Sequence, residues 1–232
     1  MPRPVFIPPQ IPSSTKAPPQ GADWIHEPKW DGYRFQIVKN GNQIRLHSRS
    51  GADYSDRLPM MSEAFAELPT RAAVLDGELY LLDATGAADF RRFMAAMRTR
   101  RPNESQLMFF AFDLLHQDGV DLCQLPLSER KQDLQKLCAK SRVPYMRLVQ
   151  TFPDGAALLE HCNTMGFEGV VSKRLASRYS SGPSRSWVKT KCPGWKRINA
   201  ERWRIFEAPS KPTLTEAQKT LAKKRTGREG DL

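Results

Sequence analysis

The chain has 232 residues, of which 40% are hydrophobic and 26% are charged, proportions that exclude a fibrous or wholly disordered protein. No apolar run approaches the roughly 20 residues of a membrane span, and the first residues show neither a secretory nor an organellar signal. With 36 Lys and Arg against 25 Asp and Glu, the net charge of +11 favours a polyanionic partner, nucleic acid before an anionic membrane surface.

Proline, turn and periodicity patterns predict the elements of the chain. Seven prolines within residues 1–20 predict an extended arm, because proline disrupts helices and central strands. The alternating residues 33–38 and 43–48 flank a turn-forming segment and predict a β-hairpin. Hydrophobic patterns further along predict helices over residues 58–68, 89–101, 127–140 and 154–165, and strands over residues 73–75, 79–82, 108–115 and 169–173, with the ordered core closing at residues 187–191.

Beyond that core, residues 193–232 are polar, with weak helical patterning over residues 215–224. We therefore expect an arm over residues 1–20, a folded domain over residues 21–192, and a basic, partly disordered tail over residues 193–232. The cysteines lie at wide spacings without a CxxC pair, which argues against a disulfide framework and a zinc knuckle and predicts reduced thiols in a cytoplasmic protein. They are Cys123, Cys138, Cys162 and Cys192.

A segment of purely positive charge lies between residues 169 and 200, which contain eight basic residues and no acidic one. Three aromatic residues are interleaved with these cations, a pattern typical of a phosphate-binding surface. The predicted nucleic-acid contacts within it are Arg174, Arg178, Arg185, Lys196 and Arg197.

A candidate nucleophile lies in residues 27–34, EPKWDGYR, where an aspartate follows Lys29 by two positions and Arg34 follows it by five. A lysine amine is inert while protonated and becomes nucleophilic when it is buried or placed near other cations. Arg34 and the lysines of the basic stretch could provide that environment while also binding phosphates. The alternative interpretation is a chance cluster on the surface.

Residues 29–34 resemble the KxDGxR nucleophile motif of the covalent nucleotidyltransferases, which comprise ATP-dependent DNA ligases, RNA ligases and mRNA capping enzymes. Four later segments resemble further motifs of these enzymes in the same order: DGE at 76–78, FAFDLL at 110–115, EGVVSK at 168–173 and WVKTK at 187–191. The flank RYSSG at residues 178–182 is similar to bacterial ligases associated with end joining. Five ordered motifs across residues 24–191 make the resemblance specific.

The resemblance implies roles for the residues that bind the nucleoside. Lys29 would attack the α-phosphate of ATP, expel pyrophosphate and hold AMP as a phosphoramidate. Glu27 would read the amino edge of adenine, while Arg34 and Arg49 would contact ribose and phosphate. Phe112 would stack on the base, the alternative being an ordinary core phenylalanine.

The resemblance also implies roles at the phosphates. Glu78 and Glu168, both expected at strand ends, would bind Mg²⁺ (or Mn²⁺) or the ribose, since oxygen ligands suit a hard cation. Lys173 and Lys189 would neutralise the charge of the triphosphate in the transition state, and Lys191 would join them or belong only to the basic stretch.

The implied fold is α+β, an ATP-grasp-like nucleotidyltransferase domain with antiparallel sheets flanked by helices and ATP bound between them. Only 41 residues follow Lys191, fewer than a five-stranded barrel needs, so the OB-fold that ligases usually carry is expected to be absent. An amino-terminal DNA-binding domain is likewise not expected.

The implied function is that of an ATP-dependent DNA ligase reduced to its adenylation domain. It would transfer AMP to a DNA 5′-phosphate and seal nicks or breaks in DNA repair and recombination. The expected partners are nicked or broken duplex DNA and a DNA-end-binding or clamp protein that replaces the OB-fold, with no membrane, in a nucleoid-associated cytoplasmic location.

Two other functions remain open. An RNA ligase or capping-type nucleotidyltransferase shares the nucleophile motif, although the FDLL and WVKTK segments favour DNA ligase. A non-catalytic nucleic-acid-binding relative of ligases is the second alternative. The presence of Lys29, Glu78 and Glu168 argues against it, because binding alone does not require them.

Overall fold

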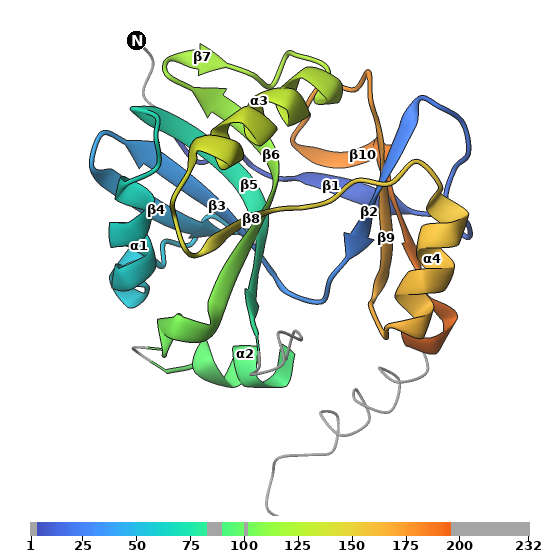
Figure 1. Cartoon of the computed structure of the whole chain (residues 1–232), viewed down its shortest axis with the longest axis horizontal. Helices are drawn as coiled ribbons and strands as arrows, with labels where there is room; N and C mark the ends of the chain where they lie inside the picture. Colours follow the sequence, from blue (N-terminus) through green and yellow to red (C-terminus); the bar gives the residue numbers. More distant parts are fainter. Residues whose placement is uncertain (1–3, 83–89, 100–101, 196–232) are drawn as a thin grey trace, which may run out of the picture. The chain divides into compact units, whose positions relative to one another are not determined.

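Two β-sheets with helices packed against them form the part of the chain that the computed structural model describes, residues 4–82, 90–99 and 102–195 (Figure 1). The strands are β1 (Gln10–Ser14), β2 (Trp24–Lys29), β3 (Tyr33–Asn40), β4 (Gln43–Ser48), β5 (Ala72–Leu81), β6 (Leu107–Gln117), β7 (Val120–Asp121), β8 (Met146–Leu148), β9 (Gly169–Arg174) and β10 (Gly182–Lys191). The helices are α1 (Pro59–Ala66), α2 (Phe90–Ala96), α3 (Leu127–Lys140) and α4 (Gly155–Thr164), with short 3₁₀ turns at Ser55–Arg57 and Glu104–Gln106.

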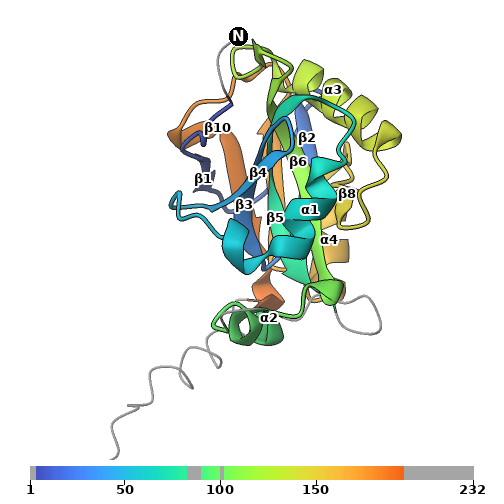
Figure 2. The same ribbon diagram turned by 90° about the vertical axis from the view of Figure 1, so that its left-hand side faces the viewer.

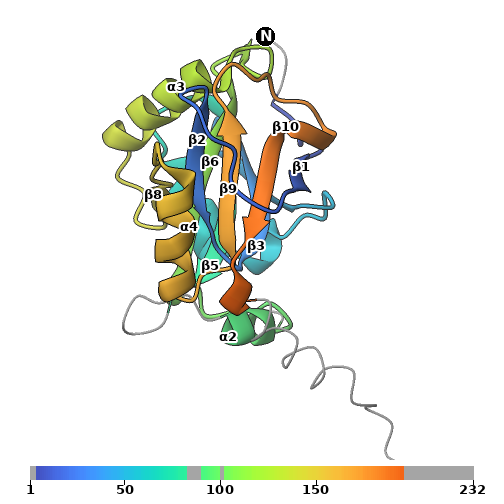
Figure 3. The same ribbon diagram turned by 90° about the vertical axis from the view of Figure 1, so that its right-hand side faces the viewer.

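The four-stranded sheet has the order β1-β10-β9-β2, and the six-stranded sheet has the order β4-β3-β5-β6-β7 with β8 beside β6. Neighbouring strands run antiparallel except in the pairs β1–β10 and β6–β8, which are parallel. Helix α4 packs against β2 and β9, whereas α1 and α3 contact β4 and β6 of the other sheet (Figure 2, Figure 3). This largely antiparallel two-sheet arrangement confirms the expected α+β fold.

The six-stranded sheet buries both of its faces. Successive residues of one strand point to opposite faces, and accordingly Leu75 and Leu114 belong to the core under α1 and α3. Their neighbours Val74 and Leu115 belong instead to a second cluster with Trp187 of the four-stranded sheet. The two sheets are therefore packed against each other, and β10 is held close to β5 and β6.

Local signals explain why α3 and α4 match the sequence-based prediction. Asp154, the residue before α4, accepts hydrogen bonds from the backbone N–H groups of Ala156 and Ala157 at 2.9 and 3.0 Å, an N-cap that satisfies the helix terminus. Along α3 the buried residues recur at helical spacing, as expected for a helix with one face in the core. They are Leu127, Arg130, Leu134 and Leu137.

A single strand, β5, replaces the two short strands expected on either side of residues 76–78. These three residues pair with both β3 and β6. A Cβ on Gly77 would lie 2.3 Å from the Phe109 ring, so the glycine provides close packing inside the strand rather than a turn. Glu78 therefore lies within a strand and not at a strand end, contrary to the expectation.

Strand β1 lies within the segment expected as an extended arm. It pairs with β10 at the edge of the sheet, where Pro12 is tolerated, and its register shifts between Pro12 and Ser13. Gln10 is fully buried, donates to Ser184 Oγ at 3.0 Å and accepts from the Ser180 N–H at 2.8 Å. The segment is extended, but residues 10–14 belong to the sheet and so to the folded domain.

The remaining boundaries differ more modestly. The first two helices are shorter than expected, and β2, β7 and β8 have no counterpart among the expected elements. At the other end Trp195 packs against the buried cluster of α4 and β9, while residues 196–232, including the expected helical segment, lie outside the described residues. Within the described ranges, no helix is long and apolar enough to cross a membrane.

Candidate active site

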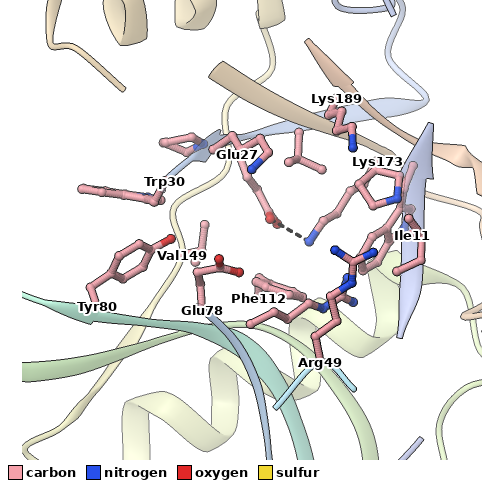
Figure 4. A pocket seen from close by; sticks show the side chains of 16 residues that line it. Ile11, Glu27, Trp30, Arg49, Glu78, Tyr80, Phe112, Val149, Lys173 and Lys189 are labelled. Carbon is pink, nitrogen blue, oxygen red and sulfur yellow. Dashed lines mark ion pairs between the residues drawn. The ribbon is translucent and has the colours of Figure 1, made fainter. Parts of the chain in front are cut away.

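A pocket opens between the two sheets, and residues of both sheets line it (Figure 4). Strands β2, β9 and β10 contribute from one side, and β3, β5 and β6 from the other. The lining includes these residues singled out from the sequence: Glu27, Lys29, Arg34, Arg49, Glu78, Phe112, Lys173 and Lys189. The fold thus gathers side chains from all five motif segments into one pocket.

Lys29 is the last residue of β2, and its amine reaches the carboxylate that precedes β9. Lys29 Nζ lies 2.5 Å from Glu168 Oε2, and Lys191 Nζ lies 3.1 Å from Oε1 of the same residue. The Lys29 side chain is 22% exposed, so the amine is accessible from the pocket. A Cβ on Gly169 would lie 2.0 Å from the Thr190 carbonyl oxygen, so glycine is needed for β10 to approach and to keep Glu168 beside both lysines.

Two residues earlier on β2, Glu27 forms ion pairs with lysines from two other elements. Lys173 Nζ lies 2.7 Å from Glu27 Oε2, and Lys131 of α3 pairs with Oε1. Burial lowers the pKa of Lys173 to about 8, although Glu27 opposes the shift. The ring centroids of Phe112 and Trp187 lie 4.2 and 4.1 Å from Lys173 Nζ, so two aromatic faces also stabilise this ammonium.

The sequence predicts that Lys173 acts at the phosphates, whereas the structure places its amine beside Glu27. In the β2–β9 register Lys173 lies opposite Ile25, so Glu27 separates it from Lys29 along the strand. Lys189 of β10 lies, like Lys191, near the nucleophile, and burial together with the charges of Lys29 and Lys191 lowers the pKa of Lys189. The cations of the pocket therefore form two groups, one around Glu27 and one around Lys29.

Arg34 is held by a bidentate ion pair with Asp76. The Nε and Nη2 atoms donate to the two carboxylate oxygens at 3.0 and 2.7 Å, and Nη1 donates to the Gln10 carbonyl at 2.6 Å. The Tyr179 hydroxyl donates to the same carboxylate at 2.6 Å. These contacts fix the guanidinium at the pocket wall, so only its remaining N–H groups can bind a ligand.

Glu78 pairs with Arg34 in the β3–β5 register and lines the pocket near Tyr80 (Figure 4). Burial raises the pKa of Glu78 to about 7, against the opposite effects of Lys29 and Arg34. Within the described ranges, no group of three His, Cys, Asp or Glu residues could hold a metal by itself. Glu78 and Glu168 together supply two carboxylates, and Mg²⁺ is typically bound by one or two carboxylates completed by substrate phosphates.

Two features of the site were missed in the sequence. Trp30 packs against the rings of Tyr80, Phe110 and Phe167, with centroid distances of 5.5, 5.5 and 4.5 Å, and so joins the ends of both sheets beside Lys29. Trp30 lies inside the nucleophile motif, and this position was the sequence signal that could have identified it as a site residue. Lys131 has no local signal, because its partner on β2 is 104 residues away.

The predicted nucleic-acid contacts lie on the surface where the structure describes them. Arg174, Arg178 and Arg185 are exposed, and Arg174 also pairs with Asp23 at 3.3 Å. Lys196 and Arg197 lie outside the described residues. The role of these residues in DNA binding stays a prediction.

Comparison with known proteins identifies the family. Residues 10–191 match the model of the ATP-dependent DNA ligase domain. The multifunctional non-homologous end joining protein LigD of Pseudomonas aeruginosa is 36% identical over 192 residues, 82% of this chain and 22% of that protein. A probable DNA ligase of Rhodococcus jostii is 35% identical over 174 residues, 74% of this chain and 34% of that protein. The chain thus spans about a third or less of these relatives.

Solved structures of DNA ligases also resemble this chain, in agreement with the family match. The ligase domain of Mycobacterium tuberculosis LigD superposes with a TM-score of 0.69 at 32% identity, over 79% of this chain and 58% of that one. The mycobacterial DNA ligase D complexed with ATP and MES superposes equally well, with a TM-score of 0.69 at 31% identity over 79% of this chain and 59% of that one. The DNA ligase-adenylate of Chlorella virus, with a TM-score of 0.56 at 18% identity over 81% of this chain and 69% of that one, shares the fold. This chain therefore belongs to the ATP-dependent DNA ligase family, and its residues 10–191 form the adenylation domain.

Proposed function

We propose that the pocket transfers AMP from ATP to Lys29, the step that begins DNA ligation. The observation that carries this proposal is the accessible Lys29 amine, 2.5 Å from Glu168 and surrounded by the residues of the matched motifs. Nζ must lose a proton before it attacks, and the Glu168 carboxylate is the acceptor within reach. A bond then forms between Nζ and the α-phosphorus as the bond from that phosphorus to the bridging oxygen breaks, and pyrophosphate leaves.

The two groups of cations suggest how ATP is oriented. The Glu27 carboxylate would accept a hydrogen bond from the 6-amino group of adenine, and Phe112 would stack on the base. Arg34 would contact the ribose, and the exposed Arg49 the phosphates. This orientation places the α-phosphate toward the end of β2, where Lys29 lies.

The triphosphate end combines cations with carboxylates. Lys189 and Lys191 would neutralise the departing pyrophosphate, because opposite charge placed where charge develops lowers the barrier. Glu78 and Glu168 would hold Mg²⁺ (or Mn²⁺), which when bound would offset the charge of the phosphate oxygens. The contribution of the protein itself would be to position the α-phosphate in line with Nζ.

The later steps of ligation extend the proposal to DNA. The adenylate would pass from Lys29 to a DNA 5′-phosphate, and a 3′-hydroxyl would then attack that phosphate and release AMP. Nicked or broken duplex DNA is the proposed substrate, in DNA repair and recombination. The names of the LigD relatives give non-homologous end joining for those proteins. A DNA-end-binding or clamp protein and a nucleoid-associated cytoplasmic location complete the proposal.

A pulse-chase experiment tests the proposal. The full chain is incubated with α-labelled ATP and Mg²⁺, freed of nucleotide, and then mixed with nicked duplex. We expect label to appear first on the protein and then on the DNA 5′-end, and labelled GTP to give neither product. Absence of a labelled protein at any Mg²⁺ or Mn²⁺ concentration would contradict the proposal, and labelling by GTP would favour a capping-type enzyme.

The pKa of Glu78 predicts an unusual stability effect. Because folding raises this pKa from 4.5 to about 7, the folded state binds the proton more tightly. The contribution of Glu78 to stability is therefore present below pH 4.5 and is lost as the pH rises through about 7. We expect Glu78→Gln to stabilise the protein by on the order of 1–2 kcal/mol at pH 8 and little at pH 4.5, while it impairs adenylation.

Urea denaturation at both pH values measures this difference. Glu63→Gln, an exposed substitution on α1, is the matched control and should change neither stability nor adenylation. Equal stability of wild type and Glu78→Gln at pH 8 would show that the carboxylate is not destabilised by its burial.

The charge of the carboxyl-terminal residues predicts a contribution to DNA binding. Residues 196–232 contain ten Lys and Arg against five Asp and Glu, all beyond the matched domain. Because Trp195 packs on the domain, the deletion should begin at residue 196. We expect it to weaken duplex binding, to lower the slope of log K against log salt by about 0.9 per lost phosphate contact, and to leave Lys29 labelling intact.

Fluorescence anisotropy with nicked duplex at several salt concentrations measures this effect. The melting temperatures of both chains are compared first, so that a loss of folding is recognised. An unchanged affinity and salt slope would mean that these residues do not bind DNA.

A further inference from the structure

The Glu27 carboxylate has each of its oxygens occupied by a different lysine. Lys173 of β9 pairs with Oε2 at 2.7 Å, and Lys131 of α3 pairs with Oε1. The three side chains are 4%, 2% and 12% exposed for Glu27, Lys173 and Lys131, so the arrangement is largely shielded from water. A carboxylate held on both sides by charged hydrogen-bond donors keeps one orientation.

Lys131 holds this position because its helix is anchored to both sheets. The preceding residue, Arg130, forms a bidentate pair with Asp113 of β6 at 2.9 and 2.8 Å, while Lys131 reaches Glu27 on β2. The first turn of α3 is attached to the segment after β9, since the Leu127 N–H donates to a backbone carbonyl there at 2.9 Å. Two consecutive basic residues therefore join the sheets across the Glu27 end of the pocket.

Lys131 approaches Glu27 from outside the pocket. Glu27 lines the pocket between the sheets, whereas Lys131 lines a neighbouring pocket beside Gln132 and Gln135 of the same helix. The ion pair thus crosses the wall between the two. Lys131 does not itself line the pocket between the sheets, and its ion pair with Glu27 connects it to that pocket.

We propose that Lys131 is a positioning residue that sets the base selectivity of the pocket by holding the Glu27 carboxylate in one orientation. The proposal rests on the function proposed above, in which Glu27 reads the adenine edge. An ionised carboxylate only accepts hydrogen bonds, so it favours a base with a 6-amino donor and disfavours a base with a 6-oxo acceptor. Without Lys131, Oε1 is buried and unpaired, and the carboxylate can rotate away from the position in which it accepts from the 6-amino group.

The experiment compares ATP with inosine triphosphate, whose base carries the 6-oxo group in place of the amino group. Equilibrium dissociation constants of both nucleotides are measured without metal by calorimetry, and KM and kcat of Lys29 adenylylation are measured with Mg²⁺. The full-length variants are Lys131→Met, Lys131→Arg and the control Lys136→Met. Lys136 lies on the same helix, where its side chain is 69% exposed.

We expect Lys131→Met to bind ATP about tenfold more weakly, as loss of a charged hydrogen bond implies, and to lose most of its discrimination against inosine triphosphate. Its kcat at saturating ATP should stay within about twofold of wild type, and Lys131→Arg should restore selectivity. Unchanged dissociation constants in Lys131→Met, or a fall in kcat and melting temperature with discrimination intact, would overturn the proposal. If wild type binds ATP selectively but takes up no label, the proposed function fails, while the binding constants still decide the role of Lys131.

Discussion

Replacing Lys29 by alanine is expected to abolish formation of the protein–AMP adduct, lowering it by a factor on the order of 10³ or more. The adduct requires a nucleophilic nitrogen at the end of β2, and alanine provides none. The adduct of the wild-type protein should be labile to acid, as a phosphoramidate is. Gel electrophoresis after incubation with α-labelled ATP and Mg²⁺ measures the adduct directly.

A second variant tests whether the positive charge at position 29 is sufficient for adenylation, and a third serves as the control. Lys29→Arg retains the positive charge opposite Glu168 but carries a guanidinium, which stays protonated and does not attack. It should therefore be as inactive as Lys29→Ala. Lys16→Ala, a change at an exposed lysine near the amino terminus, should label like wild type. Labelling of Lys29→Ala at the wild-type level would show that another residue carries the AMP.

The largest loss of stability is expected from Arg130→Met. The Arg130–Asp113 pair is 0% exposed on both sides. Removing the guanidinium leaves the Asp113 carboxylate buried without a counter-charge and removes the donor to the Leu125 and Ser177 carbonyls. A buried ion pair broken in this way costs about 3–5 kcal/mol, which urea denaturation at pH 7 would detect as a lower midpoint.

A double variant tests whether the loss comes from the unpaired charge. Arg130→Met combined with Asp113→Leu removes both charges, and we expect it to recover about half or more of the lost stability. Arg142→Met, a substitution of an exposed arginine after α3, should change stability by less than about 0.5 kcal/mol. A loss below about 1 kcal/mol in Arg130→Met would show that the pair contributes little.

Features encoded by neighbouring residues could be predicted from the sequence. The β3–β4 hairpin depends on alternation around a short turn, α4 on its Asp154 cap, and α3 on its own apolar spacing. The motif residues were likewise found by their order, because the chemistry of covalent nucleotidyl transfer requires particular side chains at short spacings. Eight of the predicted site residues, among them Glu27 and Arg49 outside these motifs, line one pocket.

Features that depend on distant contacts were mispredicted or missed. Residues 76–78 look like a break between strands, yet β3 and β6 pair with them on both sides and make β5 continuous. The proline-rich start was predicted only as an extended arm, yet Gln10 is buried through bonds to Ser180 and Ser184, about 170 positions away. In each case the partner that stabilises the segment lies far along the chain.

The sequence by itself determined the family, the nucleotide, the candidate nucleophile Lys29 and the order of its motifs, because these depend on residue types at short spacings. Only the tertiary structure decided which charges meet. It brings the amines of Lys173 and Lys131 to the Glu27 carboxylate, and those of Lys29 and Lys191 to the Glu168 carboxylate. Such pairings arise when strand register and helix docking bring distant residues within 4 Å, and no local pattern records them.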